Sequence, residues 1–415
     1  MSQRPDRRNL SNDPSIGASP SERQPFRVAI LGAGVAGCTL AAELCRRGWD
    51  PKTIGLWEAG RGPGGRMATR RSRRNPNLRI NNGASLFNIR TSPPPTVLSP
   101  LLEQGWVEPW RERVAVINAA ADILPHQGQD PLLEGNCYQG RPGMEQVCGG
   151  LLHLAGDNLC TTFNTLIRSL ERDQDRWLLK NAEGAIVGES ESLVLTGTLL
   201  AHPRSRLTFG WRTPPMQELA EQLQDPGLNH ALAAISALRF ESRSSLLIHL
   251  APEEAAAWHA LPFRLLVFEP ASQQRWGLWR VCIQPQEDGS CAVVAHSNAT
   301  FAAEHIGIYG SRSAIARQLG LTATTAQEQA VIEALGESLT DVLGHWLPPK
   351  PLAGGDRQLM RWGGAFPLQP ALPVALNWIP SLRLGFCGDF LAGPGFARVE
   401  GAMQSAQLLA SQLMP

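Results

Sequence analysis

The sequence predicts an α/β fold, in which a helix-covered parallel sheet is combined with a discontinuous antiparallel β-sheet plus helix domain. Three observations predict it. An apolar strand enters a glycine-rich turn and then a helix within residues 28–47, a second strand ends on an acidic residue at position 58, and the pattern of strand, glycine turn and helix returns within residues 384–415. A strand-rich stretch precedes residues 384–415, and it makes the first domain discontinuous in sequence.

The first observation is the sequence Gly32-Ala-Gly34-Val-Ala-Gly37, which directly follows the apolar residues 28–31. Gly32 allows a tight turn, Gly34 lets the backbone approach a diphosphate, and Gly37 lets the following helix, expected over 36–47, pack closely on the strand. The N-terminus of that helix offers unpaired N–H groups and a partial positive charge to an anion. The turn is therefore typical of a dinucleotide-binding site.

The second observation is Glu58, which ends a strand expected over residues 53–57. It stands about 20 residues after Gly37, the spacing at which a carboxylate accepts hydrogen bonds from an adenosine ribose. The strand, the turn, the helix and the acid together make the match much more specific than three glycines alone.

Length and composition set the broad class. The 415 residues suggest two or three domains, and 43% hydrophobic residues suffice for sizeable cores. The net charge of +1 gives no electrostatic reason to expect nucleic acid or an anionic membrane as a partner, and no apolar run is long enough to span a bilayer. The eight cysteines form no CxxC pair and no Cys/His cluster with metal-ligand spacing, which indicates no metal site and free thiols in the cytoplasm.

The patterns along the chain predict its division. Residues 1–25 are rich in Ser, Pro, Arg and Asp and are expected to form a disordered tail. Residues 26–95, 141–200 and 346–415 are assigned to the first domain, and residues 96–140 and 201–345 to a second, substrate-covering domain. Helices are expected over 141–156, 216–223, 313–319 and 326–343, and strands over 159–169, 176–181, 192–197, 244–250, 265–268, 276–284 and 290–297.

Two further segments favour FAD over NAD as the dinucleotide. In the glycine-rich stretch 58–66, paired glycines let the backbone pass against a cofactor, and Arg61 and Arg66 can form charge-assisted bonds to phosphate. Near the C-terminus, a strand ends in Gly-Asp at Asp389, and a loop leads to a helix that starts near residues 399–402. Asp389 would bond a ribityl hydroxyl, and the helix N–H groups would face the flavin edge where negative charge develops on reduction.

These motifs resemble those of renalase-like flavoproteins within the FAD-dependent amine oxidase superfamily. The resemblance covers residues 26–90, 141–197 and 384–415. It rests on the glycine turn with Glu58, on Arg61-Gly-Pro-Gly-Gly-Arg66-Met-Ala-Thr-Arg70, on Asn82-Gly83-Ala84-Ser85-Leu-Phe87, on Arg141-Pro-Gly-Met144, and on Gly388-Asp389 with Val399-Glu400-Gly401-Ala402.

Carried over position by position, the resemblance implies a non-covalently bound FAD and the following contacts. Its diphosphate would be held by Gly32, Gly34, Val35, Ala36 and Gly37, and its adenosine ribose by Glu58. Phosphate or ribityl oxygens would be contacted by Arg61, Gly65 and Arg66, and the adenine by the backbone of Ile167. The flavin ring would lie near Gly83 and Ala84, and the site would be closed by Gly388, Asp389, Val399, Glu400 and Ala402.

The implied activity is that of a soluble FAD-dependent oxidoreductase that takes a hydride from a small organic substrate to flavin N5 and passes the electrons to oxygen or another acceptor. Family members commonly carry Asp-His-Gly-Ala-Gln where this chain has Asn81-Asn-Gly-Ala-Ser85, and residues 198–204 replace a usual Pro-Ala or Pro-Gln segment. Two alternatives therefore stay open: an NAD(P)-dependent reductase, and a catalytically degenerate dinucleotide-binding or scaffold protein. No catalytic residue is assigned.

Some polar and aromatic residues allow two interpretations. The arginine-rich stretch 66–79 is expected to be a solvated loop with one or two cofactor contacts, because a nucleic-acid patch would interleave aromatic residues. His202 and His296 are either hydrogen-bonded structural residues or proton carriers. Trp276 and Trp279 are either core residues or a wall of the substrate space.

Overall fold

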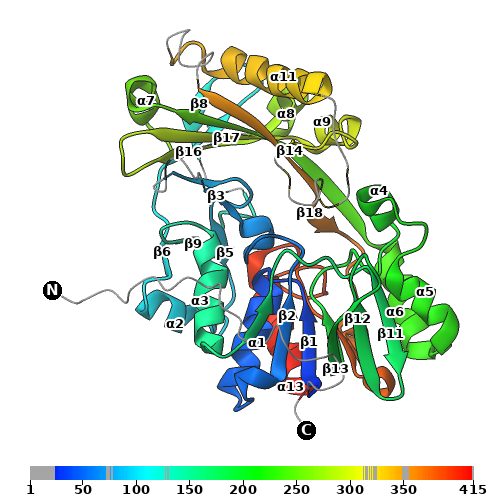
Figure 1. Ribbon diagram of the computed structural model, residues 1–415. Helices are drawn as coiled ribbons and strands as arrows, with labels where there is room; N and C mark the ends of the chain where they lie inside the picture. Colours follow the sequence, from blue (N-terminus) through cyan, green and yellow to red (C-terminus); the bar gives the residue numbers. More distant parts are fainter. Residues whose placement is uncertain are drawn as a thin grey trace.

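The computed structural model describes residues 24–71, 75, 78–126, 128, 130–311, 313, 316, 318, 320, 325–347 and 355–413. Outside the described residues lie the predicted tail up to residue 23, Arg73 and Arg74 of the arginine-rich stretch, and most of the helix predicted over 313–319. The described chain forms two large sheets, one in each half of the molecule, with helices packed on them (Figure 1).

The first sheet has eight strands in the order β10-β2-β1-β13-β12-β11, with β20 beside β13 and β19 beside β20. Strands β10, β2, β1, β13 and β20 run parallel, whereas β11, β12 and β19 pair antiparallel. The carboxyl ends of the parallel strands therefore meet at one edge of the sheet. The bounds are β1 (Phe26–Leu31), β2 (Ile54–Trp57), β10 (Cys160–Thr162), β11 (Ser169–Asp173), β12 (Arg176–Lys180), β13 (Ile186–Leu195), β19 (Trp378–Ile379) and β20 (Leu384–Phe386).

Helices cover both faces of this sheet, which explains why β1 is apolar without alternation. Val28 and Ile30 belong to the core shared with α1, α3 and α13, while Ala29 and Leu31 belong to the core shared with α5 and α6. Successive side chains of a strand point to opposite faces, so both faces of β1 need apolar residues. The helices are α1 (Val35–Arg46), α3 (Glu145–Ala155), α13 (Val399–Gln412), α5 (Pro215–Leu223) and α6 (Pro226–Ala237).

The second sheet has seven strands in the order β18-β14-β17-β16-β15-β7-β8 and is antiparallel except between β15 and β7. Its longest strands, β14 and β18, run toward the first domain (Figure 1). One face packs in a core with α7, α8 and α11. The bounds are β7 (Val114–Ile117), β8 (Ile123–Pro125), β14 (Arg239–Leu250), β15 (Leu265–Phe268), β16 (Leu278–Pro285), β17 (Cys291–Ser297), β18 (Asp356–Leu368), α7 (Pro252–His259), α8 (Pro270–Trp276), α9 (Ala299–Glu304) and α11 (Thr325–Leu343).

Smaller elements join the two sheets. A two-stranded and a three-stranded sheet are formed by strands within residues 69–140, between β2 and β10, and carry loops that line the site described below. Their bounds, with the remaining short helices, are β3 (Thr69–Arg71), β4 (Arg79–Asn81), β5 (Phe87–Ile89), β6 (Val107–Pro109), β9 (Asn136–Gly140), α2 (Leu98–Glu103), α4 (Ser205–Phe209), η2 (Pro51–Thr53), η3 (Gly65–Met67), η4 (Val374–Leu376) and η5 (Pro380–Leu382).

Strand pairing differs from the predicted division of the chain. Residues 346–415 were expected in the first domain, but β18 within them pairs along β14 and so belongs to the second sheet. The expected strand 159–169 is also shorter, because β10 ends at Thr162 and the chain then turns around the loop after β2. There the N–H of Asn164 donates to the carbonyl of Gly60 at 2.7 Å, and the N–H of Thr165 donates to that of Glu58 at 3.0 Å.

The strand expected over 276–284 begins two residues later than predicted. Trp276 is the last residue of α8, and Gly277, at a φ of +66°, ends that helix in the left-handed conformation that glycine adopts readily. Strand β16 therefore begins at Leu278. Trp276 packs in the core with α11, where its indole N–H donates to Asp341 at 2.7 Å, whereas Trp279 lines the cavity described below.

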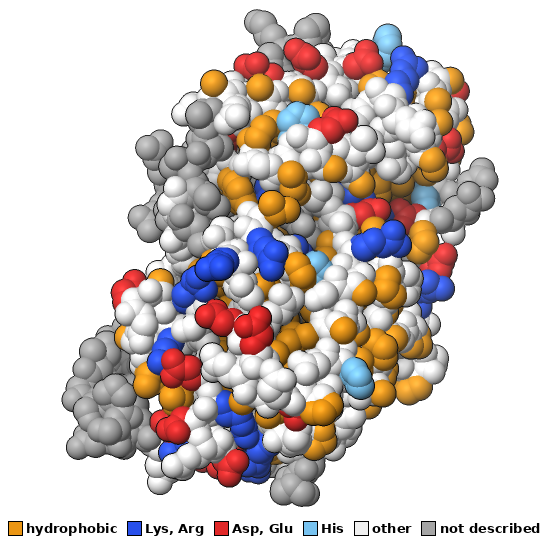
Figure 2. Space-filling model, turned by 90° about the vertical axis from the view of Figure 1, so that its right-hand side faces the viewer, with side chains coloured by type: hydrophobic (Ala, Val, Ile, Leu, Met, Phe, Trp, Pro, Cys, Tyr) orange, Lys and Arg blue, Asp and Glu red, His pale blue; other side chains and the backbone are white. Residues whose placement is uncertain are grey.

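None of the helices in the described part of the chain combines the length and the apolar character that a bilayer crossing needs. On the face shown in Figure 2, basic and acidic side chains are interspersed among polar and apolar ones. This distribution matches the near-zero net charge.

Candidate functional site

A cavity of about 3120 Å³ opens at the carboxyl ends of the parallel strands and extends to the second sheet. Pockets for ordinary small molecules measure roughly 300–1,000 Å³, so this space is large enough for a dinucleotide and a further molecule. Leu31, Glu58, Thr196 and Asp389, at or just beyond the ends of four parallel strands, line it from the first domain. The location is the one at which open α/β sheets bind ligands.

In the turn after β1, some glycines are required by backbone conformation or packing, and one is not. Gly32 has a φ of +116°, and a methyl group on Gly37 would lie 2.0 Å from the carbonyl oxygen of Gly32. Gly34 is different, because its φ of −78° and ψ of −175° suit any residue and a methyl group there would meet nothing within 4 Å. The space beside Gly34 belongs to the cavity, so glycine at this position leaves room for a ligand.

The N-terminus of α1 faces the same space. Gly34 is its N-cap residue and has no side chain to accept from the N–H groups of the first turn. Val35 and Ala36, which begin the helix, line the cavity. Unpaired N–H groups and the positive end of the helix dipole favour a bound anion, and a diphosphate fits both.

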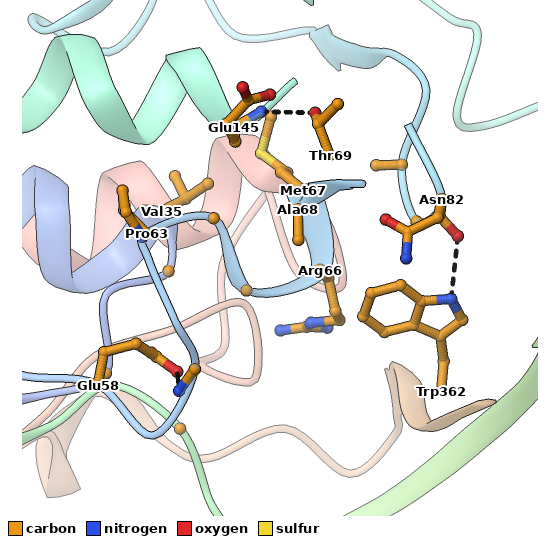
Figure 3. A pocket seen from close by; sticks show the side chains of 18 of the residues that line it. Val35, Glu58, Pro63, Arg66, Met67, Ala68, Thr69, Asn82, Glu145 and Trp362 are labelled. Carbon is orange, nitrogen blue, oxygen red and sulfur yellow. Dashed lines mark hydrogen bonds between the residues drawn. The ribbon is translucent and has the colours of Figure 1, made fainter. Parts of the chain in front are cut away.

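Glu58 lies beside the turn and is held by backbone. Its Oε2 accepts from the N–H of Ala33 at 2.8 Å, and its Oε1 accepts from the N–H of Gly60 at 2.6 Å. Burial raises the pKa of this carboxyl, while the two backbone hydrogen bonds act in the opposite direction. Each oxygen keeps a second lone pair for a hydroxyl donor. Figure 3 shows Glu58 on one side of the pocket and Asn82 on the other, with Arg66 between them.

Arg66 and Asp389, both predicted cofactor contacts, form a bidentate ion pair. Nη1 and Nη2 of Arg66 each donate to one oxygen of Asp389 at 2.6 Å, and Nη1 also donates to the carbonyl of Ala365 at 3.1 Å. This pair connects the glycine-rich loop to the C-terminal segment across the cavity. Either group could meet a ligand oxygen with the donors or acceptors that the pair leaves available.

The flavin-side residues of the prediction lie against Arg66 and the second sheet. The N–H of Ala84 donates to the carbonyl of Arg66 at 3.0 Å, and a methyl group on Gly83 would lie 2.0 Å from the same oxygen. The indole of Trp362 donates to the carbonyl of Asn82 at 3.1 Å (Figure 3). Trp362 therefore fixes this loop from β18 and lines the cavity itself.

Glu400 does not close the site as expected. It is fully buried, and its Oε1 accepts from the N–H groups of Arg90 and Thr91, while its Oε2 pairs with Arg398 at 3.0 Å. Its carboxylate is therefore used to attach α13 to the end of β5. Gly37 also does not line the cavity; it allows α1 to pack closely on β1 and the turn.

The remaining predicted cofactor residues share one property, which is that they line the cavity. They are Gly32, Gly34, Val35, Ala36, Glu58, Arg61, Gly65, Arg66, Gly83, Ala84, Ile167, Gly388, Asp389, Val399 and Ala402. Five separate segments of the sequence are thus brought together by the parallel strands and the loops that follow them.

The second sheet adds cavity residues that the motifs did not indicate. They are basic or aromatic: Arg243 on β14, Arg280 on β16, and Arg361 and Trp362 on β18. They lie in the lining with Trp279, for which the sequence left a core role and a cavity-wall role open. The available signal was an arginine within an otherwise apolar strand, as in Leu278-Trp-Arg280-Val-Cys-Ile283. Such an arginine is seldom fully buried unless it is paired, and Arg280 is paired with Asp130.

The two candidate histidines have different positions. Nε2 of His202 lies 2.9 Å from the carbonyl of Leu238, outside the cavity lining, which supports a structural role. His296 lines the cavity, and its Nδ1 lies 2.8 Å from Oγ of Ser245. Burial, and then the charges of Arg280 and Arg243, lower the pKa of His296 to about 3. His296 is therefore neutral near pH 7 and acts through hydrogen bonding.

Groups of three or more His, Cys, Asp or Glu side chains able to hold a metal ion do not occur among the described residues. Cys282, the cysteine in the cavity lining, lies 3.2 Å from Oγ of Ser85, and burial raises the pKa of its thiol. A thiol with a raised pKa is a poor nucleophile for covalent attachment of a cofactor.

Comparison with known proteins agrees with this architecture. A family model described as an NAD(P)-binding Rossmann-like domain matches residues 30–99. Curated proteins gave no significant match to the sequence. Among solved structures, a putrescine oxidase bound to putrescine has a TM-score of 0.59 at 14% identity, covering 94% of this chain and 99% of that one.

Two other solved structures are similar over nearly the whole chain. Cyclohexylamine oxidase from Brevibacterium oxydans has a TM-score of 0.62 at 13% identity, covering 94% of this chain and 99% of that one. An oxidoreductase from Methanosarcina mazei has a TM-score of 0.58 at 11% identity, covering 92% and 99%. The chain therefore has a Rossmann-like domain within the overall fold that these solved structures share.

Proposed function

We propose that this chain is an FAD-dependent oxidoreductase that binds FAD non-covalently and oxidises a small organic substrate. The observation that carries the proposal is Gly34, a glycine required by neither backbone conformation nor packing, at an uncapped helix N-terminus that opens into a cavity large enough for a dinucleotide and a substrate. FAD, when bound, supplies the acceptor for a substrate hydride at flavin N5.

The chain's own residues would bind and orient the two molecules. The N-terminus of α1 would hold the diphosphate, and Glu58 would accept from the ribose. Arg61, Arg66 and Asp389 would contact phosphate or ribityl oxygens, with Ile167 at the adenine and Gly83 and Ala84 at the flavin. These assignments follow the resemblance to renalase-like flavoproteins, and the similar structures include a putrescine oxidase and a cyclohexylamine oxidase.

A second candidate is an NAD(P)-dependent reductase, which the description of the matching family model favours. The glycine-rich loop with Arg66 and the C-terminal Gly388-Asp389 unit favour FAD, because both line the cavity beyond the part that a Rossmann turn alone explains.

Anaerobic mixing tests the proposed reaction. The FAD-loaded protein is mixed without oxygen with dihydronicotinamides, amines and organic acids in turn, and the flavin absorption is followed. We expect one class to bleach the flavin bands and oxygen to restore them. Turnover that needs added NAD(P) and no flavin would favour the reductase, and absence of both reactions would favour a binding or scaffold protein.

A further inference from the structure

The cavity contains an unbalanced group of arginines around a bulge in β18. In the register between β14 and β18, Arg243 lies opposite Trp362, and Glu241 lies opposite Phe366. Residues 363–365 of β18 therefore form a bulge opposite Ser242 of β14. Bulges often lie next to active sites, where they redirect backbone and side chains. This bulge faces the first domain, because Nη1 of Arg66 donates to the carbonyl of Ala365 at 3.1 Å.

Two more guanidinium groups lie against the same bulge. A methyl group on Gly364 would lie 2.1 Å from Nη1 of Arg204, and one on Gly363 would lie 3.1 Å from Nη2 of Arg361. Larger residues at either glycine would displace these side chains. The bulge therefore provides the space in which Arg204, from the loop after β13, meets Arg361, from β18.

The charges of this group do not cancel among the described residues. Asp389 is engaged by both Nη atoms of Arg66. The contacts of Arg204 are uncharged, with Thr198 Oγ1 at 3.2 Å and the ring of Phe240 at 4.1 Å. Arg361 likewise contacts an uncharged group: its guanidinium lies 4.3 Å from the ring centre of Tyr309.

Both arginines also carry a buried donor without an acceptor. Nε of Arg204 and Nε of Arg361 are shielded from solvent and have no hydrogen-bond partner among the described residues. Burial, and then the nearby positive charges of Arg66 and Arg361, lower the pKa of Arg204 to about 10, although Asp389 opposes this shift. Like charges held close together repel each other, and an anion that pairs with both removes this repulsion.

We propose that Arg204 and Arg361 bind the anionic group, a carboxylate or a phosphate, of an organic substrate with an apolar body; this deepens, and rests on, the proposed oxidoreductase function. The apolar body would lie along Phe240, Trp279 and Phe366, which line the same cavity. The cofactor diphosphate is the other possible anion, but α1 already offers it a binding site, and Arg361 comes from the second sheet.

This assignment separates the chain from the structure solved with putrescine. Putrescine is a diamine and cationic near neutral pH, whereas the unpaired charges beside the bulge are positive. A cationic substrate would be repelled by Arg204 and Arg361, and an anion would satisfy both and their unpartnered donors. Arg204 and Arg361 therefore select a substrate that carries negative charge.

Calorimetric titration of the FAD-loaded protein tests the proposal with three probes that share an apolar body: phenylacetate, phenethylamine and phenylethanol. Phenyl phosphate is added to distinguish phosphate from carboxylate. We expect the anions to bind at least about tenfold more tightly than the alcohol and the amine, since a charge-assisted hydrogen bond contributes roughly 1.5–3 kcal/mol. Equal affinity for phenylacetate and phenylethanol would overturn the proposal.

Arg204→Gln and Arg361→Gln are measured beside the matched control Arg206→Gln, whose side chain is exposed on α4. We expect each of the first two to weaken phenylacetate binding about tenfold or more, without changing FAD affinity or the unfolding midpoint, and the control to change neither. Loss of FAD affinity with unchanged phenylacetate binding would assign both arginines to the cofactor and overturn the proposal.

Failure of the proposed function gives a different result. A protein that takes up no FAD contradicts the oxidoreductase assignment. The same titrations of that protein then decide the anion site, because the bulge and both arginines belong to the chain. A preference for anions that depends on Arg204 and Arg361 would support the site, and no preference would overturn it.

Discussion

Glu58 combines an observed structural role in the glycine turn with a proposed role in binding the ribose. Its two oxygens accept from the N–H groups of Ala33 and Gly60, which fixes the glycine turn and the next loop relative to each other. A glutamine would have to place an NH₂ group against one of these N–H donors, so Glu58→Gln is not a conservative change here. The ribose would use the lone pairs that remain.

We therefore predict that Glu58→Gln and Glu58→Ala lower FAD affinity about tenfold or more while the chain still folds. Titration with FAD measures the affinity, and the unfolding midpoint of the apoprotein reports the fold. Glu103→Gln, at an exposed position on α2, is the control and should change neither. Unchanged FAD affinity in both Glu58 variants would contradict the ribose role.

At the scale of the element, the turn between β1 and α1 contains glycines that the fold needs and one glycine, Gly34, that we propose is needed for binding. A methyl group on Gly37 would overlap the carbonyl oxygen of Gly32, whereas one on Gly34 would enter open space in the cavity. Sequence spacing identifies both glycines as parts of one motif, but their distinct roles depend on the packing around them.

This contrast gives a matched pair of variants. We expect Gly37→Ala to lower the free energy of unfolding by about 1–3 kcal/mol or more through overpacking. Gly34→Ala should leave it unchanged or raise it by about 0.4–1 kcal/mol, because the backbone angles suit alanine, and it should weaken FAD binding. Urea denaturation of the apoproteins and FAD titration measure both. Full FAD affinity in Gly34→Ala would contradict a diphosphate at this turn.

Elements formed by local pattern were predictable, and elements decided by distant pairing were not. The strand, turn and helix of residues 26–46 follow from glycine positions and apolar runs within a short window. Residues 356–368 were assigned to the first domain without a predicted strand, because only the pairing of β18 with β14, more than 100 residues earlier, places them in the second sheet. Arg204 and Arg361, beside the bulge of β18, escaped prediction for the same reason.

For the whole molecule, buried carboxylates connect segments distant in sequence and make stability depend on pH. Glu400 joins the start of α13 to Arg90 and Thr91 at the end of β5. Although burial acts to raise its pKa, hydrogen bonds from Thr91, Arg398 and Arg90 lower it below the ordinary value of 4.5. A family motif placed Glu400 at the cofactor, but its side chain serves the fold, which spacing alone does not reveal.

Because folding lowers its pKa, Glu400 contributes stability above about pH 4.5, and this contribution is lost as the pH falls through the lower, folded-state value. We predict that Glu400→Gln lowers the free energy of unfolding at pH 7 by about 1–3 kcal/mol and reduces its loss between pH 5 and pH 3. Urea denaturation at several pH values measures this, with the exposed Glu183→Gln as control. A variant with an unaltered pH profile would argue against the role.

The visible absorption spectrum of the purified protein, followed by heat release and identification of any cofactor, tests the central claim most directly. The account predicts flavin absorption bands, present on purification or gained after adding FAD, and release of intact FAD on denaturation. A colourless protein that takes up no added FAD would contradict the claim and withdraw the cofactor assignments for the turn, Glu58 and Asp389.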